Sequence, residues 1–231
     1  MAKNGKRFLE IKKKVDEKFF YNISDAIKLL KETSNAKFDE TVEAHIRLGI
    51  DPRHAEQQVR STVILPFGVG KIKKILVFAK GEKEKEALSF GADFVGLEEL
   101  VNKIKNGWID FDVVIATPDV MGIISKIGKI LGPRGLMPNP KVGTVTNDIS
   151  KAIKEIKLGK IEFKNDKNGI IHIVFGKASF ENISLEKNFK VLINEIIKNK
   201  PNTIKDSYFK SITIKSTMGP GIKINIKEII N

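Results

Sequence analysis

The segments Ile75-Leu76-Val77-Phe78-Ala79 and Val113-Val114-Ile115-Ala116 are continuous apolar runs, and Phe94-Val95 is a shorter one. Strands of this composition are buried on both faces, as they are in parallel sheets. Helix-like stretches lie between and after these runs, at residues 82–89, 97–106, 118–130 and 148–158. Buried strands that alternate with helices are typical of a parallel sheet with helices on each side. We therefore predict a Rossmann-like α/β domain of three layers in the middle of the chain.

The flanking parts of the chain have a different strand pattern. In residues 41–50, Val42, Ala44, Ile46, Leu48 and Ile50 alternate with polar or small residues. Such alternation predicts a strand with one buried and one open face. The same pattern recurs at residues 60–65, 209–215 and 222–226. These strands predict a sheet that is packed on one side only.

Helices and a turn accompany the alternating strands. Amphipathic helices are expected at residues 8–15, 24–33 and 184–198. Ser24 is a plausible N-cap for the second of them. Residues 165–169 read Asn-Asp-Lys-Asn-Gly, which predicts the turn of a hairpin between strands at 161–163 and 170–175.

The change of pattern along the chain indicates a discontinuous organisation. Residues 1–68 and 159–231 are expected to form one α+β domain, into which residues 69–158 are inserted as the α/β domain. Two crossings would connect the domains and act as a double hinge.

Composition favours a polyanionic partner. The chain has 231 residues, a hydrophobic content of 41% that is sufficient for packed cores, and a formal net charge of +13. Nucleic acid is favoured over a membrane surface, because no basic helix carries the Trp, Phe and Leu face that adsorption needs. We expect neither a signal peptide nor a membrane span, and the absence of cysteine excludes disulfides, zinc–thiolate sites and thiol nucleophiles. A reducing cytoplasm fits this composition.

Signals for enzymatic chemistry are weak. Gly68-Val69-Gly70-Lys71 resembles a phosphate loop only faintly, because Ile72 stands where a metal-binding hydroxyl is needed. No glycine fingerprint follows the first buried strand, and the three histidines, His45, His54 and His172, have no metal-type spacing. Asp51 and His54 lack a nearby nucleophile. We expect no catalytic residue, metal or cofactor; the alternative is a nucleotide-dependent enzyme built on the inserted domain.

Two short segments are candidates for contact with RNA. In residues 37–41, Phe38 is either a core residue or an aromatic at a sheet edge that meets an RNA backbone or ribose. In residues 211–221, hydroxyls line one face and lead into a turn with two glycines. Such a segment suits phosphate and 2′-OH contacts, but it is equally compatible with an ordinary strand–turn–strand.

A long loop at residues 131–144 contains three prolines, three glycines and two cations. Loops of this length are usually functional or disordered, and its prolines argue against disorder. We expect a shaped surface for RNA or for a protein partner.

Four segments together resemble a known family. They are residues 111–119, residues 131–145, Asn165-Asp166-Lys167-Asn168-Gly169-Ile170-Ile171-His172, and Ser216-Thr217-Met218-Gly219. The sequence is similar to the L-one family of large-subunit ribosomal proteins, of the bacterial type. The resemblance runs through essentially the whole chain, and the loop at 131–145 is its most specific element.

The resemblance implies two domains, with the second inserted into the first. It implies binding to the large-subunit rRNA of a mobile stalk beside the tRNA exit site, assistance in the release of exit-site tRNA, and repression of the protein's own operon mRNA. It also implies a ribosome-associated cytoplasmic protein that is a monomer when free. A dedicated repressor that never joins ribosomes is the remaining alternative.

The family's RNA-binding residues can be carried over to matching positions. The resemblance implies that Lys37, Phe38 and Thr41 form one cluster and that Ser211, Thr217, Met218 and Gly219 form a second. Asp166, Lys167 and Gly169 are further candidates, of lower rank.

Two positions depart from the family's pattern. Phe67 stands where members commonly have His, which puts the stiffness of the hinge in doubt. His54-Ala55-Glu56 stands where members often have a second basic residue, which can weaken a peripheral phosphate contact at neutral pH.

Overall fold

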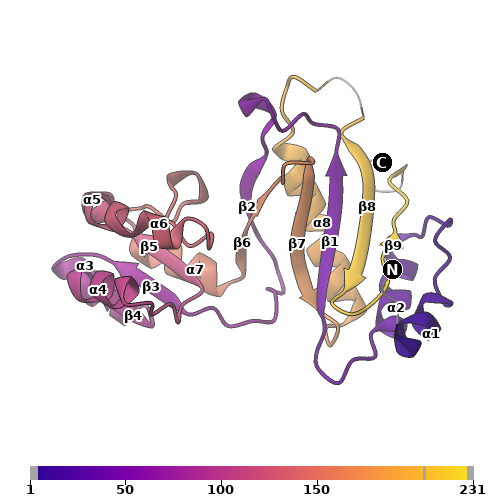
Figure 1. Cartoon of the computed structure of the whole chain (residues 1–231), viewed down its shortest axis with the longest axis horizontal. Coiled ribbons are helices and arrows are strands. Elements are labelled where there is room, and N and C mark those ends of the chain that lie inside the picture. The colour runs from indigo at the N-terminus through magenta and orange to yellow at the C-terminus, as the bar shows by residue number, and fades with distance from the viewer. Residues whose placement is uncertain (1–4, 205–206, 228–231) are drawn as a thin grey trace. The chain divides into compact units, whose positions relative to one another are not determined.

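The computed structural model describes residues 5–204 and 207–227, so the outermost ends of the expected discontinuous domain lie outside the described residues. The chain divides into two compact units (Figure 1). Unit 1 comprises Met1–Gly70 and Ile161–Asn231, and unit 2 comprises Lys71–Lys160. The predicted mixture of an α+β fold with an α/β fold is confirmed.

Unit 1 contains an antiparallel sheet in the order β7 (Ile170–Lys177), β1 (Thr41–Leu48), β8 (Phe209–Ser216) and β9 (Ile222–Lys223). The predicted alternation is confirmed in β1, whose even-numbered residues are buried and whose odd-numbered residues are not. α2 (Ile23–Thr33) and α8 (Asn182–Lys198) contribute to the same core as the buried side of the sheet. The other side stays open (Figure 1).

Smaller elements complete unit 1. α1 (Lys6–Lys12) and the short 3-10 helix η1 (Ala55–Gln57) lie in its N-terminal part. β2 (Arg60–Ile64) pairs with β6 (Lys160–Lys164) in a separate two-stranded sheet.

Two local predictions for unit 1 are wrong. β6 and β7 belong to different sheets, so the turn at 165–169 does not close a regular hairpin. The turn itself forms, with the Asp166 N–H bonded to the Ile170 carbonyl at 2.8 Å, but β7 takes β1 as its partner. Ser24 is not an N-cap, because α2 begins one residue earlier at Ile23. The Ser24 hydroxyl instead donates to Glu186 on α8 at 3.1 Å.

Unit 2 is a three-layer α/β structure, as predicted. Its parallel sheet has the order β4 (Phe94–Gly96), β3 (Ile75–Phe78) and β5 (Val113–Ala116). α3 (Glu82–Ser89) and α7 (Ile149–Lys157) share one core with the sheet, and α4 (Glu98–Lys105) shares the other with residues 120–131. β3 is buried along its whole length, which explains its continuous apolar sequence.

The single helix predicted at 118–130 is broken into short pieces. They are η2 (Pro118–Val120), α5 (Met121–Ile124), η3 (Ser125–Ile127) and α6 (Gly128–Leu131). Gly122 and Gly128 lower the helix propensity of the segment. The Ser125 hydroxyl donates to the Met121 carbonyl at 2.8 Å, a back-bonding contact that bends helices.

The long loop that follows contains one further 3-10 helix, η4 (Pro140–Val142). Asn139 caps this helix by accepting the Lys141 N–H at 2.8 Å. Within the described part of the chain, no helix is long and apolar enough to span a bilayer.

Candidate nucleic-acid interface

A buried carboxylate organises the beginning of β1. Glu40 is only 1% exposed, and its two oxygens accept hydrogen bonds from different segments. One oxygen accepts the Ala36 N–H at 3.0 Å, and the other accepts the Met218 N–H at 2.9 Å. Burial by itself raises the pKa of Glu40, but the hydrogen bonds from Met218 and Ala36 outweigh it and lower the pKa overall. An ionised side chain therefore ties the segment before β1 to the turn after β8.

Thr217 joins the same two segments. Its hydroxyl accepts the Thr41 N–H at 3.0 Å and donates to the Thr41 carbonyl at 3.3 Å. The Lys177 ammonium on β7 donates to the Thr41 hydroxyl at 2.9 Å. The hydroxyls of Thr41 and Thr217 thus both have partners inside the chain, which the sequence did not indicate.

The turn after β8 leaves little room for a side chain at Gly219. The Gly219 N–H donates to the Ser216 carbonyl at 3.1 Å. A Cβ added to Gly219 would lie 2.4 Å from the Ser216 hydroxyl oxygen, which is a clash. Gly219 therefore shapes the turn that carries Met218.

Two large apolar side chains project from these anchored segments. Phe38 is 55% exposed and Met218 is 46% exposed, while Lys37 beside Phe38 is exposed as well. The alternative of Phe38 as a core residue is excluded by its exposure. We call this group, which comprises Lys37, Phe38, Glu40, Thr41, Thr217, Met218 and Gly219, the clamp end of the sheet.

The candidates in the turn between β6 and β7 occupy a second place. Asp166 accepts the N–H groups of Asn168 and Ile170, both at 2.8 Å. Gly169 has a φ of +73°, and a Cβ there would come within 3.1 Å of the Ile50 side chain. Its carbonyl accepts the Leu48 N–H at 2.9 Å. Asp166 and Gly169 thus fix the turn, and Lys167 is its exposed cation.

The two groups lie at opposite ends of β1. Thr41 begins this strand and Leu48 ends it, so at roughly 3.3 Å per residue they are about 23 Å apart. Ser211 is opposite Arg47 in the register and therefore lies near the second group. The structure separates Ser211 from Thr217, although the sequence had placed them in one cluster. We call Asp166, Lys167, Gly169 and Ser211 the turn end.

Polar side chains line the open side of the sheet between the clamp end and the turn end. Glu43 on β1 is opposite Lys215 on β8, and Arg47 is opposite Ser211. Thr213 on β8 is opposite both His45 on β1 and Lys223 on β9. β7, β1 and β8 lie side by side across this face (Figure 1).

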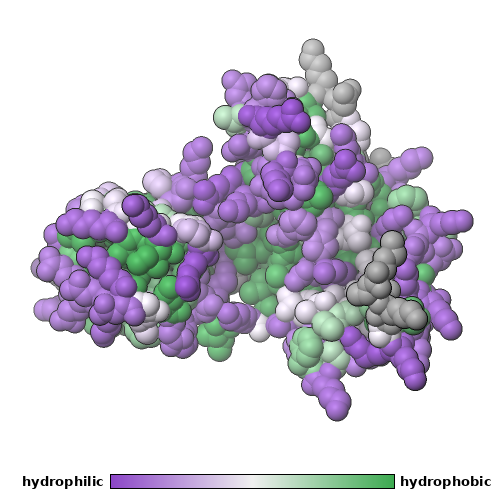
Figure 2. All heavy atoms as spheres, in the orientation of Figure 1, coloured by the Kyte–Doolittle hydropathy of each residue, from purple (hydrophilic) through white to green (hydrophobic). Residues whose placement is uncertain are grey.

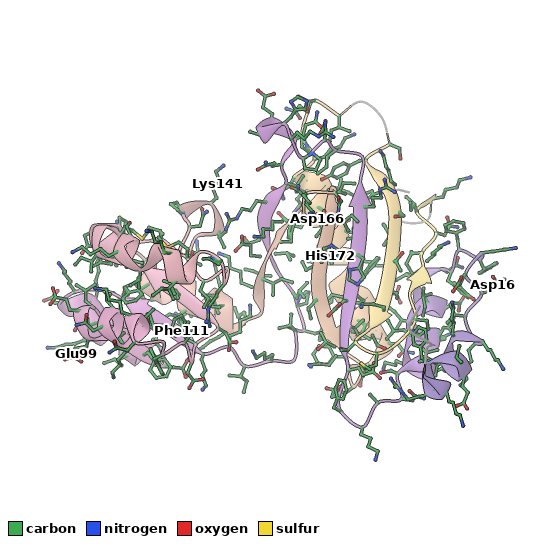
Figure 3. All side chains as sticks on the ribbon, in the orientation of Figure 1. Asp16, Glu99, Phe111, Lys141, Asp166 and His172 are labelled. Carbon is green, nitrogen blue, oxygen red and sulfur yellow. The ribbon has the colours of Figure 1, made fainter. Side chains whose placement is uncertain are left out.

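Two histidines meet in the middle of the open side. His45 and His172 are cross-strand partners, and their Nδ1 atoms are 2.7 Å apart. Each ring has a carboxylate near its Nε2, with Glu43 3.6 Å from His45 Nε2 and Asp166 3.6 Å from His172 Nε2. Figure 3 labels Asp166 and His172. Burial, together with the charges of His172 and Lys215, lowers the pKa of His45. The sequence could not indicate this pair, because the two residues are 127 positions apart.

Across residues 5–204 and 207–227, no group of three His, Cys, Asp or Glu side chains could hold a metal ion. The faint phosphate-loop match at Gly68–Lys71 has its lysine bonded to Asp112 at 2.6 Å, and Ile72 is 96% exposed beside it. Hydrophilic residues cover most of the surface that Figure 2 shows.

A basic chain with exposed aromatic, thioether and cationic groups at one end of a sheet has the features of the class of nucleic-acid-binding proteins. A family model described as the ribosomal protein L1p/L10e family matches residues 30–220. The chain belongs to this family, and the resemblance found in the sequence is confirmed. It is therefore a ribosomal protein that binds rRNA, in a family whose role is structural rather than enzymatic.

Proposed function

We propose that unit 1 holds the large-subunit rRNA of the mobile stalk beside the tRNA exit site, with the clamp end as its main contact. The observation that carries this proposal is the Glu40 anchor. Its carboxylate holds together the segment before β1 and the turn after β8, with Glu40 and Met218 178 positions apart. Phe38 and Lys37 in the first segment and Met218 in the second are exposed. Rigid, exposed apolar groups next to a cation suit the ribose and base surfaces of folded RNA.

The recognition depends on shape and backbone rather than on a base code. Phe38 and Met218 supply contact area, and Lys37 supplies attraction to phosphate. Thr41 and Thr217 support the clamp end through their mutual hydrogen bonds. Ser211, Lys167 and Arg47 extend the polar surface toward the turn end, where Asp166 and Gly169 maintain the backbone.

The finer assignments rest on family membership. We infer that residues 1–68 with 159–231 form the rRNA-binding domain and that residues 69–158 form a hinged outer domain that assists the release of exit-site tRNA. The same interface binds the protein's own operon mRNA and represses its translation. The free protein is a monomer that joins a bacterial-type ribosome in the cytoplasm.

A salt titration tests the main proposal. Binding of the full chain to a stalk rRNA fragment is compared with binding to an RNA duplex of equal length. We expect a preference for the stalk fragment that persists at physiological salt. Equal affinities that fall together as salt rises would reduce the binding to generic attraction by the charge of +13 and reject the proposal.

A pair of phenylalanine variants locates the contact. Phe38→Ala should weaken stalk binding by about 1–3 kcal/mol, the usual contribution of one aromatic stacked on a base. Phe67→Ala is the matched control, since Phe67 is 45% exposed but lies beside Lys187 of α8, the helix that packs behind the sheet. An equal loss in both variants would remove Phe38 from the interface.

A further inference from the structure

One segment of unit 2, bounded by Asp119 and Asp148, carries several cations and no carboxylate. Residues 120–147 contain Lys126, Lys129, Arg134 and Lys141 but no Asp or Glu. The other helices of the unit mix both signs; α3, for example, alternates Glu and Lys over residues 82–86. A surface of one sign over such a length favours a partner of the opposite sign.

The segment buries its apolar side chains and exposes its cations. Val120, Ile124, Ile127 and Leu131 are all fully buried in the core of unit 2. The opposite side of the same turns is exposed at Gly122, Ser125, Lys126 and Lys129. No large apolar residue between 120 and 147 is exposed. The fully exposed positions of these turns are therefore small residues and cations, while the remaining large apolar side chains are buried or partly buried.

The beginning of the long loop extends this surface. The Gly132 N–H donates to the Gly128 carbonyl at 2.8 Å, and the Leu136 N–H donates to the Leu131 carbonyl at 3.0 Å. These bonds fold the loop back against α6 and hold the exposed Arg134 next to it. We call Gly122, Ser125, Lys126, Lys129 and Arg134 the basic stripe.

The cations of the basic stripe have no internal partner. In the described part of the chain, the side chains of Lys126, Lys129 and Arg134 form no salt bridge, hydrogen bond or ring contact. By contrast, Lys71 and Lys74 at the other end of the sheet are paired with Asp112 and Asp110. The basic stripe therefore retains its full charge for an external anion.

Gly122 has no internal reason to be glycine. It lies in α5 without a positive φ, and a Cβ there would meet nothing within 4 Å. Glycine inside a helix lowers its stability, so the position loses stability without any gain in packing. Because glycine has no side chain, the backbone of a ligand can approach the backbone of α5 closely at Gly122, beside Ser125 and Lys126.

We propose that the basic stripe binds the sugar–phosphate backbone of an RNA, as a second RNA surface separate from the clamp end. This inference rests on the proposed function, in which unit 2 approaches RNA. A membrane is disfavoured because the stripe has no exposed apolar face to insert. A protein partner is disfavoured because the stripe offers no aromatic or aliphatic anchor of the kind that dominates protein interfaces.

The test compares two full-length triple variants with equal charge changes. Lys126→Gln, Lys129→Gln and Arg134→Gln together remove the cations of the basic stripe. Lys85→Gln, Lys103→Gln and Lys105→Gln remove three cations from α3 and α4, where carboxylates are neighbours. The binding constants for the stalk rRNA fragment and for deacylated tRNA are measured across a series of salt concentrations.

We expect the stripe variant to lose roughly ten-fold or more in affinity for at least one of the two RNAs. Its salt dependence should become shallower by about one unit of slope per lost phosphate contact. The control variant should stay within about two-fold of the parent. The RNA whose affinity falls in the stripe variant is the one whose sugar–phosphate backbone contacts the basic stripe. Equal losses in both variants, or capture of anionic vesicles with no change in RNA affinity, would overturn the proposal.

A second variant tests the role of Gly122. Gly122→Gln should raise resistance to urea through its better helix propensity, yet weaken RNA binding by blocking the approach. A change in stability alone, with RNA affinity intact, would show that Gly122 serves no RNA contact and would count against the proposal. Failure of the proposed function is distinguishable, since the parent protein would then bind the stalk fragment no better than a plain duplex.

Discussion

The two ends of the open sheet face are held in place by different means. At the clamp end, a buried side-chain carboxylate, Glu40, fixes two segments that are remote in sequence. At the turn end, the backbone conformation of one short segment is fixed by Asp166 and by the positive φ of Gly169. The clamp end therefore depends on long-range hydrogen bonds through Glu40 and Thr217, whereas the turn end depends on local geometry. Substitutions at the two ends should differ in how far their effects spread.

The largest effect is expected for Glu40→Ala. The substitution leaves the part-buried N–H groups of Ala36 and Met218 without their acceptor, at a cost of about 1–3 kcal/mol for each. We expect a loss of roughly 2–5 kcal/mol in the free energy of unfolding, measured by urea denaturation. Stalk RNA affinity should fall as well, because both anchored segments are released.

Glu56→Ala is the control for this loss. Glu56 is exposed in η1, and its removal should change stability by no more than about 0.5 kcal/mol. If Glu40→Ala were as mild as this control, the clamp end would not depend on the buried carboxylate.

Gly169→Ala should have the next largest effect. The left-handed backbone conformation costs a residue with a side chain about 1–2 kcal/mol, and crowding against Ile50 adds to it. Gly68→Ala is the matched variant, since Gly68 has a φ of +63° with nothing near its Cβ position. The difference between the two losses in urea unfolding measures the crowding at the turn end. Equal losses would mean that Ile50 moves away freely.

Local patterns in the sequence predicted the sheets of both units. Alternation of apolar residues assigned the buried faces of β1 and β8 correctly, and the continuous apolar runs identified the parallel sheet of unit 2. Both patterns are local consequences of which side of a strand is buried. The turn at 165–169, which ends with Gly169, was also predicted from the local sequence.

What the sequence could not provide is long-range pairing. The family resemblance grouped Ser211 with Thr217, whereas the register puts Ser211 opposite Arg47 at the other end. The local sequence assigned residues 161–163 to a hairpin with β7, but they pair with β2 instead. Glu40 showed no local sign of burial, because its partner Met218 is 178 positions away and is brought close only by the tertiary fold.

Thr217→Val should reduce the stability of the clamp end by less than Glu40→Ala does. It removes the two hydrogen bonds between the hydroxyl and the Thr41 backbone at a partly exposed site, which should cost about 0.5–1.5 kcal/mol in unfolding free energy. Thr213→Val is the control, because the Thr213 hydroxyl has no hydrogen bond among the described residues. A Thr217→Val variant with unchanged stability but weaker RNA binding would instead assign the hydroxyl to the RNA.

The smallest effect concerns the histidines between the two ends. Because the folded protein lowers the pKa of His45 below its ordinary value of 6.5, the unfolded chain binds more protons as the pH falls through that value. Stability should therefore be complete above about pH 7 and decrease as the pH drops through 6.5 toward the folded pKa. His45→Gln should abolish this dependence, and the exposed His54→Gln should leave it unchanged.

Protonation of His45 should act on RNA binding in the opposite direction. The imidazolium would add positive charge to the face that also carries Lys215 and Lys223, with Glu43 3.6 Å from its Nε2. Stalk RNA affinity should consequently rise in mild acid while stability falls, measured at constant ionic strength. If affinity and stability fell together in the parent protein, the open face between the two ends would take no part in RNA binding.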